Sequence, residues 1–225
     1  MKPIIINGEL FGLDMSISKM AVLGAGQMGN GITQVAACAG IEVVMIDIKQ
    51  EFVDRGISTI EKSLAKLVSK ERMSQEDADS ARAKISTSTD SSVCSDVDLV
   101  VEAVPEILDL KISIFSELDG ICKPDCILAS NTSSISISTI AESTNRPDKV
   151  IGMHFMNPVP IMKLVEVING KDTSEEVTAS VLEAAERMGK IPLMCNDSPG
   201  FVSNRILCPM INEAILTLQE GVAEP

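Results

Sequence analysis

The single histidine of this 225-residue chain, His154, is followed twelve positions later by Glu166, and this pair is the first candidate for chemistry. An imidazole takes up and releases protons near neutral pH, and a carboxylate beside it fixes the tautomer of the ring. Residues 150–155 and 163–168 each favour a strand, with a turn near Pro160 between them. If the strands pair antiparallel about Pro160, His154 lies opposite Glu166 and the pair could act as a general base.

This segment alone allows a second interpretation with equal weight. His154 could be a core histidine bonded to the backbone, with Glu166 solvated on an edge strand. A metal centre fits poorly, because Cys122 and Cys126 have ligand spacing but lack nearby histidine or cysteine partners. We therefore predict no metal site and reduced thiols at all six cysteines, which are Cys38, Cys94, Cys122, Cys126, Cys195 and Cys208.

A glycine-rich stretch, AVLGAGQMGNG, has the G-x-G-x-x-G spacing between a predicted strand and a predicted helix. The three glycines allow a tight turn, close approach of a pyrophosphate and close packing of the helix, whose N-terminus offers amide donors. Asp47 ends the next strand, where an acid meets the ribose hydroxyls and repels a 2′-phosphate. The pattern favours NAD over NADP, although Lys49 and Arg55 leave that preference open. The expected cofactor contacts are Gly24, Gly26, Gln27, Met28, Gly29 and Asp47.

The alternative for this stretch is a glycine-rich turn in an unrelated α/β protein, with Asp47 as an ordinary strand-end cap. A second polar stretch, ASNTSS, follows a predicted strand at residues 126–130. Asn131, Ser133 and Ser134 would therefore lie at a carboxyl end of the sheet, where open α/β sheets bind ligands. Serines and asparagines in such loops are more often turn formers and caps than ligand contacts.

Short apolar runs alternate with helical periods from residue 17 onward, which predicts an α/β fold with a doubly wound, mostly parallel Rossmann-type sheet. Residues 50–83 are charged and helical with a break near Met73-Ser74, which predicts a helical pair projecting from the sheet. The predicted strands are 19–24, 42–47, 84–89, 98–104, 126–130, 150–155 and 163–168.

Two further helices are expected near the end of the chain. The first has a capping box of Thr173 and Glu176 and stops at Gly189. The second has Ser198 as its N-cap, Pro199 at its first position, a kink at Pro209 and apolar residues over most of its circumference. Three units follow: an N-terminal extension, an NAD-binding domain and the incomplete start of a helical domain, at residues 1–17, 18–197 and 198–225.

Composition narrows the function classes. A net charge of −13 and the absence of Trp and Tyr argue against nucleic-acid binding, which needs a basic surface and benefits from aromatic stacking. No apolar run approaches the roughly 20 residues of a membrane helix. The N-terminus lacks the features of a signal peptide, so we expect a cytoplasmic protein with neither nucleic acid nor membrane as partner.

Five stretches, in chain order, closely resemble the 3-hydroxyacyl-CoA dehydrogenase family: GAGQMG, DLVVEAVPE, SNTSS, GMHFMNPVPIMKLVEV and DSPGFVSNRI. The resemblance runs from about residue 18 to the end of the chain, and its histidine-containing stretch is highly specific. It implies a Rossmann-type domain, NAD as cofactor, an acyl-CoA thioester as substrate and a role in fatty-acid metabolism. Dehydrogenases with a lysine base fit less well, because the proton-handling candidate here is a histidine.

The resemblance also implies residue roles. His154 would be the general base and Glu166 its orienting partner, while Ser133 and Asn204 would hydrogen-bond the substrate. Coenzyme A would contact Ser63 and Lys70. The family positions that line the cofactor fall on Glu106, Lys111, Asn131, Ser133 and Asn157. Lys62, Lys66 and Lys70 form a row at helical spacing that could attract phosphates, although such a row is more often a solvated helix face.

The resemblance implies NAD-dependent oxidation of short-chain 3-hydroxyacyl-CoA to 3-ketoacyl-CoA, and the reverse. Family members continue with more helices that close the site and form a homodimer, whereas this chain stops after the first of them. The alternative is therefore an NAD-binding fragment without turnover, or a structural or regulatory relative. The early stop favours the alternative, and the complete set of His154, Glu166, Ser133 and Asn204 favours the enzyme.

Overall fold

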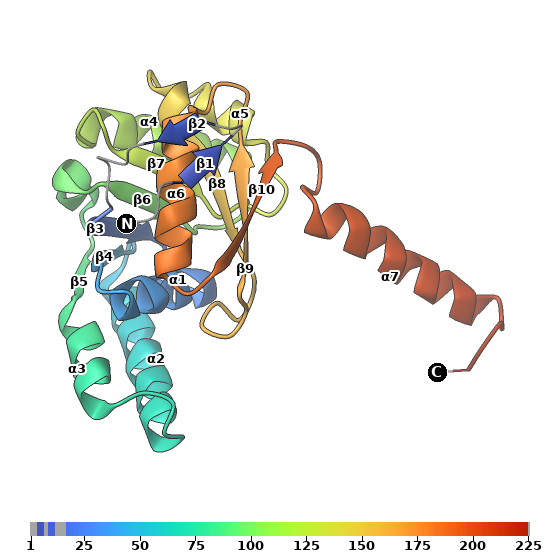
Figure 1. Ribbon diagram of the computed structural model, residues 1–225, viewed down its shortest axis with the longest axis horizontal. Coiled ribbons are helices and arrows are strands. Elements are labelled where there is room, and N and C mark those ends of the chain that lie inside the picture. Colours follow the sequence, from blue (N-terminus) through green and yellow to red (C-terminus); the bar gives the residue numbers. More distant parts are fainter. Residues whose placement is uncertain (1–3, 7–8, 12–16, 225) are drawn as a thin grey trace.

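The computed structural model describes residues 4–6, 9–11 and 17–224, and its main body is an eight-stranded sheet with helices on both faces (Figure 1). The strand order is β10-β9-β8-β7-β6-β3-β4-β5. Only the β8–β9 pair is antiparallel within the described sheet. The strands are β3 (Lys19–Leu23), β4 (Glu42–Ile46), β5 (Ile85–Ser88), β6 (Leu99–Glu102), β7 (Ile127–Ser130), β8 (Val150–Phe155), β9 (Leu164–Asn169) and β10 (Ile191–Asn196).

This topology confirms the doubly wound, mostly parallel sheet. The chain starts at the centre with β3, moves outward through β4 and β5, and returns to β6 on the other side of β3. The strand order therefore reverses between β3 and β6, and open sheets of this kind bind ligands at the carboxyl ends of the strands at that point. The loops after β3 and β6 carry the glycine-rich stretch and Glu106.

Two buried apolar clusters fill the space between the sheet and its helices. The cluster on one face includes residues of α1, α2, α3 and α6, and the other includes residues of α4 and α5. The central strands bury both of their faces, which explains their continuous apolar sequences. The helices are α1 (Gln27–Cys38), α2 (Gln50–Ser69), α3 (Gln75–Ala83), α4 (Leu108–Ile121), α5 (Ile137–Ala141), α6 (Glu175–Arg187) and α7 (Ser203–Gln219).

The helical pair predicted between residues 50 and 83 is present as α2 and α3, which extend beyond the sheet edge (Figure 1). The break lies where it was expected. Ser74 caps α3, and its hydroxyl accepts a hydrogen bond from the backbone N–H of Asp77.

The predicted capping box of α6 was wrong by one residue. Ser174 is the N-cap and accepts a hydrogen bond from the N–H of Val177. The Thr173 hydroxyl instead donates to the carbonyl of Val150 and accepts from the N–H of Gly170, so it ties the loop to β8. Gly189 has a left-handed φ of 71°, which confirms the predicted stop after α6.

The predicted start of α7 was also wrong. The helix begins at Ser203 rather than at Pro199, and Ser198 is not its N-cap. Gly200 and Phe201 have φ values of 75° and 49°, which no helix can include, and this turn buries the Phe201 ring. Sequence reasoning also missed β10, because the strand contains a proline and lies at the sheet edge with several exposed residues.

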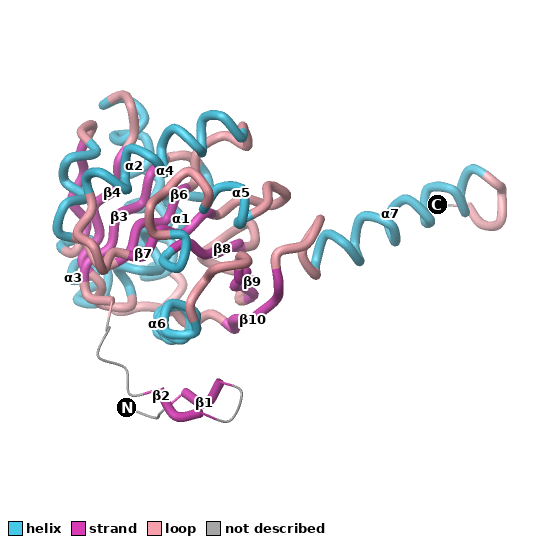
Figure 2. The backbone as a smooth tube through the Cα atoms, turned by 90° about the horizontal axis from the view of Figure 1, so that it is seen from above, coloured by secondary structure: helices cyan, strands magenta, loops and turns pink. Residues whose placement is uncertain are grey.

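Helix α7 projects away from the domain in both views (Figures 1 and 2). None of its described residues is buried, and Pro209 lies inside an uninterrupted helix, so the predicted kink does not divide it. The predicted extension at residues 1–17 lies partly outside the described residues. Within its described part, β1 (Ile4–Ile6) and β2 (Glu9–Phe11) form an antiparallel pair.

Candidate active site

The two strands predicted to bring His154 and Glu166 together do so in the expected register. His154 on β8 lies opposite Glu166 on β9. The His154 Nδ1 atom is 2.8 Å from Glu166 Oε2, and the Glu166 side chain is fully buried. The second interpretation, with Glu166 solvated on an edge strand, was therefore wrong. A buried charge needs partners with good hydrogen-bond geometry, and Glu166 has them in His154, Ser203 and the backbone N–H of Val202.

The Glu166 carboxylate is held ionised. Burial by itself raises its pKa, but hydrogen bonds from the Ser203 hydroxyl and N–H, from His154 and from the Val202 N–H outweigh burial and lower the pKa below its ordinary value. An ionised carboxylate only accepts hydrogen bonds, so Nδ1 of His154 carries the proton. The opposite nitrogen, Nε2, is then free to accept a proton.

Nε2 of His154 faces Ser133, whose hydroxyl oxygen is 3.0 Å away. Ser133 belongs to the loop after β7, at the carboxyl end of the parallel strands. Asn204, in the first turn of α7, reaches the same loop, and its Nδ2 donates to the backbone carbonyl of Ser133 over 3.3 Å. The structure thus brings together all four residues of the predicted catalytic set.

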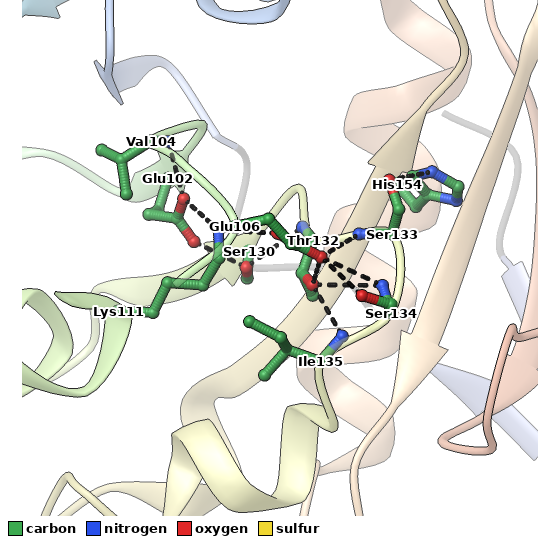
Figure 3. A network of polar contacts seen from close by, with 10 residues as sticks. All are labelled: Glu102, Val104, Glu106, Lys111, Ser130, Thr132, Ser133, Ser134, Ile135 and His154. Carbon is green, nitrogen blue, oxygen red and sulfur yellow. Dashed lines mark hydrogen bonds and ion pairs between the residues drawn. The ribbon is translucent and has the colours of Figure 1, made fainter. Parts of the chain in front are cut away.

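Glu106 holds the Ser133 loop in place (Figure 3). Its Oε1 accepts hydrogen bonds from the Thr132 hydroxyl, from the backbone N–H of Ser133 and Ser134, and from the Ser134 hydroxyl. Burial raises the Glu106 pKa, but these bonds and the charge of Lys111 lower it overall. Glu106 therefore holds the loop in the position that places the Ser133 hydroxyl beside Nε2 of His154.

A buried ion pair lies behind Glu106. Lys111 on α4 is 2.6 Å from Glu102, and both side chains are almost fully buried. Glu102 also accepts from the N–H of Val104 and from the hydroxyl of Ser130, and Lys111 lies 3.3 Å from Glu106 (Figure 3). Lys111 thus contacts two glutamates. Sequence reasoning missed Glu102 and Ser130, although an acid inside the apolar run DLVVEAV was a visible signal.

Two predicted asparagines have internal partners. The Asn131 side chain accepts a hydrogen bond from the backbone N–H of Phe155, which joins the Ser133 loop to β8. The Asn157 side chain accepts from Gln27 over 3.0 Å, which joins the loop after β8 to the glycine-rich loop. Both bonds join segments that are far apart in the sequence, so these two side chains connect loops in the structure rather than capping a local turn.

The glycine-rich loop borders a cavity of about 720 Å³ at the point where the strand order reverses. Gly24 has a φ of 101°, and a Cβ there would lie 2.6 Å from the Ala103 carbonyl oxygen. A Cβ on Gly29 would lie 1.7 Å from the carbonyl oxygen of Gly24, whereas one on Gly26 would meet open space. The loop is tight where it packs and open where a ligand would approach, as a dinucleotide fold requires.

Asp47 lies at the end of β4 and lines this cavity. Its carboxylate accepts hydrogen bonds from the backbone N–H of Ala25 and of Ile48, which orient it. Ser63 on α2 and Lys70 at its C-cap do not line this cavity, and Lys62, Lys66 and Lys70 are all exposed. Among the described residues, no group of three or more His, Cys, Asp or Glu could hold a metal ion, and the six cysteines are free.

The sheet, the glycine loop with its acid, and a histidine paired with a buried carboxylate define a dinucleotide-dependent oxidoreductase of the Rossmann class. Sequence comparison gives the family. Residues 19–198 match the family described as 3-hydroxyacyl-CoA dehydrogenase, NAD binding domain, and residues 200–225 match 3-hydroxyacyl-CoA dehydrogenase, C-terminal domain. The chain belongs to the 3-hydroxyacyl-CoA dehydrogenase family and has NAD as its cofactor.

Individual proteins that resemble this chain carry names from the same family. The chain is 56% identical to a probable 3-hydroxybutyryl-CoA dehydrogenase from Deinococcus radiodurans, over 92% of this chain and 74% of the relative. It is 46% identical to the 3-hydroxybutyryl-CoA dehydrogenase of Clostridioides difficile, over 91% and 73%. A crystal structure of (S)-3-hydroxybutyryl-CoA dehydrogenase from Ralstonia eutropha superposes with a TM-score of 0.91 at 48% identity, covering 93% of this chain and 74% of that one.

Proposed function

We propose that this chain catalyses the NAD-dependent oxidation of short-chain 3-hydroxyacyl-CoA thioesters to 3-ketoacyl-CoA, and the reverse reaction. The observation that carries the proposal is the buried His154–Glu166 pair with Ser133 at its free nitrogen. This arrangement supplies a proton acceptor with a fixed tautomer. The names of the relatives from Deinococcus radiodurans and Clostridioides difficile support 3-hydroxybutyryl-CoA as the acyl class.

The cavity beside the glycine loop fits NAD. The open space above Gly26 leaves room for the backbone to approach a pyrophosphate, and the Asp47 carboxylate at the end of β4 is placed to meet ribose hydroxyls. Arg55 also lines the cavity, so the preference over NADP rests on Asp47. We assign cofactor contacts to Gly24, Gly26, Gln27, Met28 and Asp47, which line the cavity, and propose further contacts at Gly29, Glu106, Asn131, Ser133 and Asn157. Lys111 is buried and paired with Glu102 and Glu106, so we assign it an indirect role.

Bound NAD supplies the acceptor for the hydride that leaves the 3-carbon of the substrate. Nε2 of His154 takes the proton of the 3-hydroxyl group, and the Glu166 carboxylate at Nδ1 stabilises the imidazolium that results. Ser133 and Asn204 hold the substrate oxygens by hydrogen bonds. In the reverse direction the imidazolium returns the proton to the 3-keto oxygen.

The Lys111–Glu102 pair acts in this proposal through Glu106, because Lys111 is buried behind the loop that carries Ser133. The exposed lysines of α2, together with Ser63, are assigned to the phosphates of coenzyme A, since they are a basic row on an acidic protein. We divide the chain from residue 18 onward into residues 18–197, which bind NAD, and residues 198–225, which start a helical domain. The two family matches, at residues 19–198 and 200–225, support this division.

The experiment is an assay of NADH oxidation with acetoacetyl-CoA, followed by absorbance, with free acetoacetate as the matched substrate lacking coenzyme A. We expect turnover with the thioester and little with the free acid, and weaker binding of NADPH than of NADH in a parallel titration. A protein that binds NADH but gives no turnover would support the alternative of an NAD-binding protein without catalysis.

We further propose that the chain self-associates as a homodimer through α7. Several large apolar side chains of this helix are exposed, and neighbouring exposed apolar side chains favour association. Light scattering tests this, and a monodisperse monomer would contradict it. The exposed apolar residues of α7 are Ile206, Leu207, Met210, Ile211, Ile215, Leu216 and Leu218.

Among the described residues, no helix is long and apolar enough to cross a membrane. We propose a cytoplasmic location on different grounds. The six cysteines are free, and Cys94, Cys122 and Cys126 among them are buried, as is usual for thiols of proteins in a reducing compartment.

A further inference from the structure

Ser203 makes a direct contact with the carboxylate that orients the histidine. Its hydroxyl donates to Glu166 Oε2 over 2.7 Å, and its backbone N–H donates to Glu166 Oε1 over 2.8 Å. Val202 adds a second backbone N–H to Oε1 over 3.0 Å. Because the carboxylate faces the first turn of α7, its charge is also stabilised by the helix terminus.

The two carboxylate oxygens of Glu166 therefore have different hydrogen-bond partners. Oε1 is held by backbone donors, which no side-chain substitution removes. Oε2 is shared between Nδ1 of His154 and the hydroxyl of Ser203, at 2.8 Å and 2.7 Å. The Glu166 side chain is fully buried, so bulk water does not replace a donor that is lost.

We propose that Ser203 is a positioning residue that sets how strongly Glu166 stabilises the protonated form of His154. This inference rests on the proposed function, in which His154 exchanges a proton with the substrate. The hydrogen bond from the Ser203 hydroxyl compensates part of the negative charge on Oε2. The negative charge that is not compensated stabilises the imidazolium of His154. Since Ser203 opens α7, and Asn204 beside it reaches the Ser133 loop, the first turn of α7 contacts both ends of the His154 proton path.

Other titratable groups near Glu166 are few among the described residues. From β10, the Cys195 thiol is neutral, because burial and the charges of Glu166 and Asp197 raise its pKa to about 11. From β8 the group is His154 itself. On α7, the charged residue of the first turn is Arg205, which donates to the Ser198 hydroxyl. A change at Ser203 should therefore be transmitted through Glu166 to His154.

Substitutions at Ser203 and at Glu166 should move the titration of His154 in opposite directions. Replacing Ser203 by alanine removes one donor from Oε2 and leaves both backbone donors on Oε1. Oε2 then carries more uncompensated charge, so the protonated ring becomes more stable and the titration of His154 moves to higher pH. Glu166→Gln removes the charge and moves the titration to lower pH. Opposite shifts from two variants of one contact are not expected from general loosening of the site.

The test uses the fact that His154 is the only histidine. NMR of the imidazole C–H resonances, recorded from pH 4 to pH 10 on the whole chain, gives its titration midpoint without any assay of turnover. We expect Ser203→Ala to raise the midpoint by about half a unit or more. Ser203→Thr keeps the hydroxyl and should match the parent. Ser198→Ala removes a hydroxyl from the same linker without touching Glu166 and should also match.

A midpoint for Ser203→Ala at or below that of the parent overturns the inference, as does an equal upward shift in Ser203→Thr or Ser198→Ala. In the assay with acetoacetyl-CoA, the pH at which the rate of Ser203→Ala falls on the alkaline side should rise by the same amount as the NMR midpoint. The reason is that reduction of the 3-keto group needs the protonated imidazole. A parent without turnover would refute the proposed function and leave the NMR result to decide the role of Ser203.

Discussion

Glu102 and Glu166 are both completely buried carboxylates, yet they sit beside different partners and do different work. Glu102 lies against Lys111 at 2.6 Å and also binds a backbone N–H and the Ser130 hydroxyl. Glu166 lies against His154 at 2.8 Å and binds two backbone N–H groups and the Ser203 hydroxyl. The number and kind of donors are nearly the same.

The difference lies in the basic partner. A lysine keeps its charge throughout the neutral range when a carboxylate is beside it, so the Glu102–Lys111 pair is a fixed part of the frame. Histidine is the side chain that ordinarily exchanges protons in that range, so in the proposed function the charge of the Glu166–His154 pair changes during turnover. One pair thus supports the loop that carries Ser133, and the other, in the function proposed above, exchanges the proton with the substrate.

The largest effect should come from the histidine. His154→Gln removes the proton acceptor while keeping a polar side chain of similar length, so turnover should fall by roughly 10²–10⁴. NADH affinity should stay near that of the parent, because His154 does not line the cofactor cavity. Steady-state kinetics and a fluorescence titration with NADH measure the two quantities. Retained turnover would remove the His154–Glu166 pair from the mechanism.

The next largest effect should come from Lys111, and it should appear in the free energy of unfolding. Lys111→Met leaves the Glu102 charge buried without its partner, and breaking such a pair costs about 3–5 kcal/mol of the free energy of unfolding. The double variant Lys111→Met with Glu102→Gln removes both charges and should recover part of that loss. Urea unfolding of the parent and both variants measures this. If Lys111→Met unfolds at the same urea concentration as the parent, the pair does not stabilise the frame.

The same two glutamates show what sequence could and could not predict. Glu166 was placed opposite His154 because both lie on strands with a period of two and a short turn between them, so a count along the chain gave the register. Glu102 was overlooked because its partner Lys111 lies on a helix, and no short-range pattern links a strand end to a helix side chain. Ser203 was missed for a related reason, since the turn at Gly200 and Phe201 moves the helix start away from the expected Ser198.

Another carboxylate, Asp98, has Lys123 as its partner and tests whether pairing matters when burial is incomplete. Burial raises its pKa, but hydrogen bonds from Lys123 and from the backbone of Ser18 and Lys19 lower it to about 2. A lowered pKa adds stability that is complete above about pH 4 and is lost as the pH falls towards 2. With its partial exposure, the contribution should be roughly 2 kcal/mol.

Asp98→Asn should therefore be less stable than the parent at pH 5, and the difference should shrink as the pH approaches 2. Urea midpoints of both proteins at pH 5, 3.5 and 2.5 provide the measurement. A difference that is independent of pH would mean that Asp98 stabilises the fold by shape rather than by charge.

The smallest effect should come from an exposed charge on the helical projection. Lys70 ends α2 and is assigned to coenzyme A phosphates, where water and salt screen the attraction. Lys70→Ala should raise KM for acetoacetyl-CoA about two- to fivefold at low salt, without changing kcat, because exposed charge contacts contribute only a fraction of a kcal/mol. Lys171→Ala is the matched control, since it changes the net charge equally but follows β9, which lies beside the edge strand β10 on the side of the sheet away from β4 and β5. The KM difference for Lys70→Ala should disappear at high salt. An equal rise in KM for Lys171→Ala would assign the effect to net charge and would leave α2 without a specific role in binding coenzyme A.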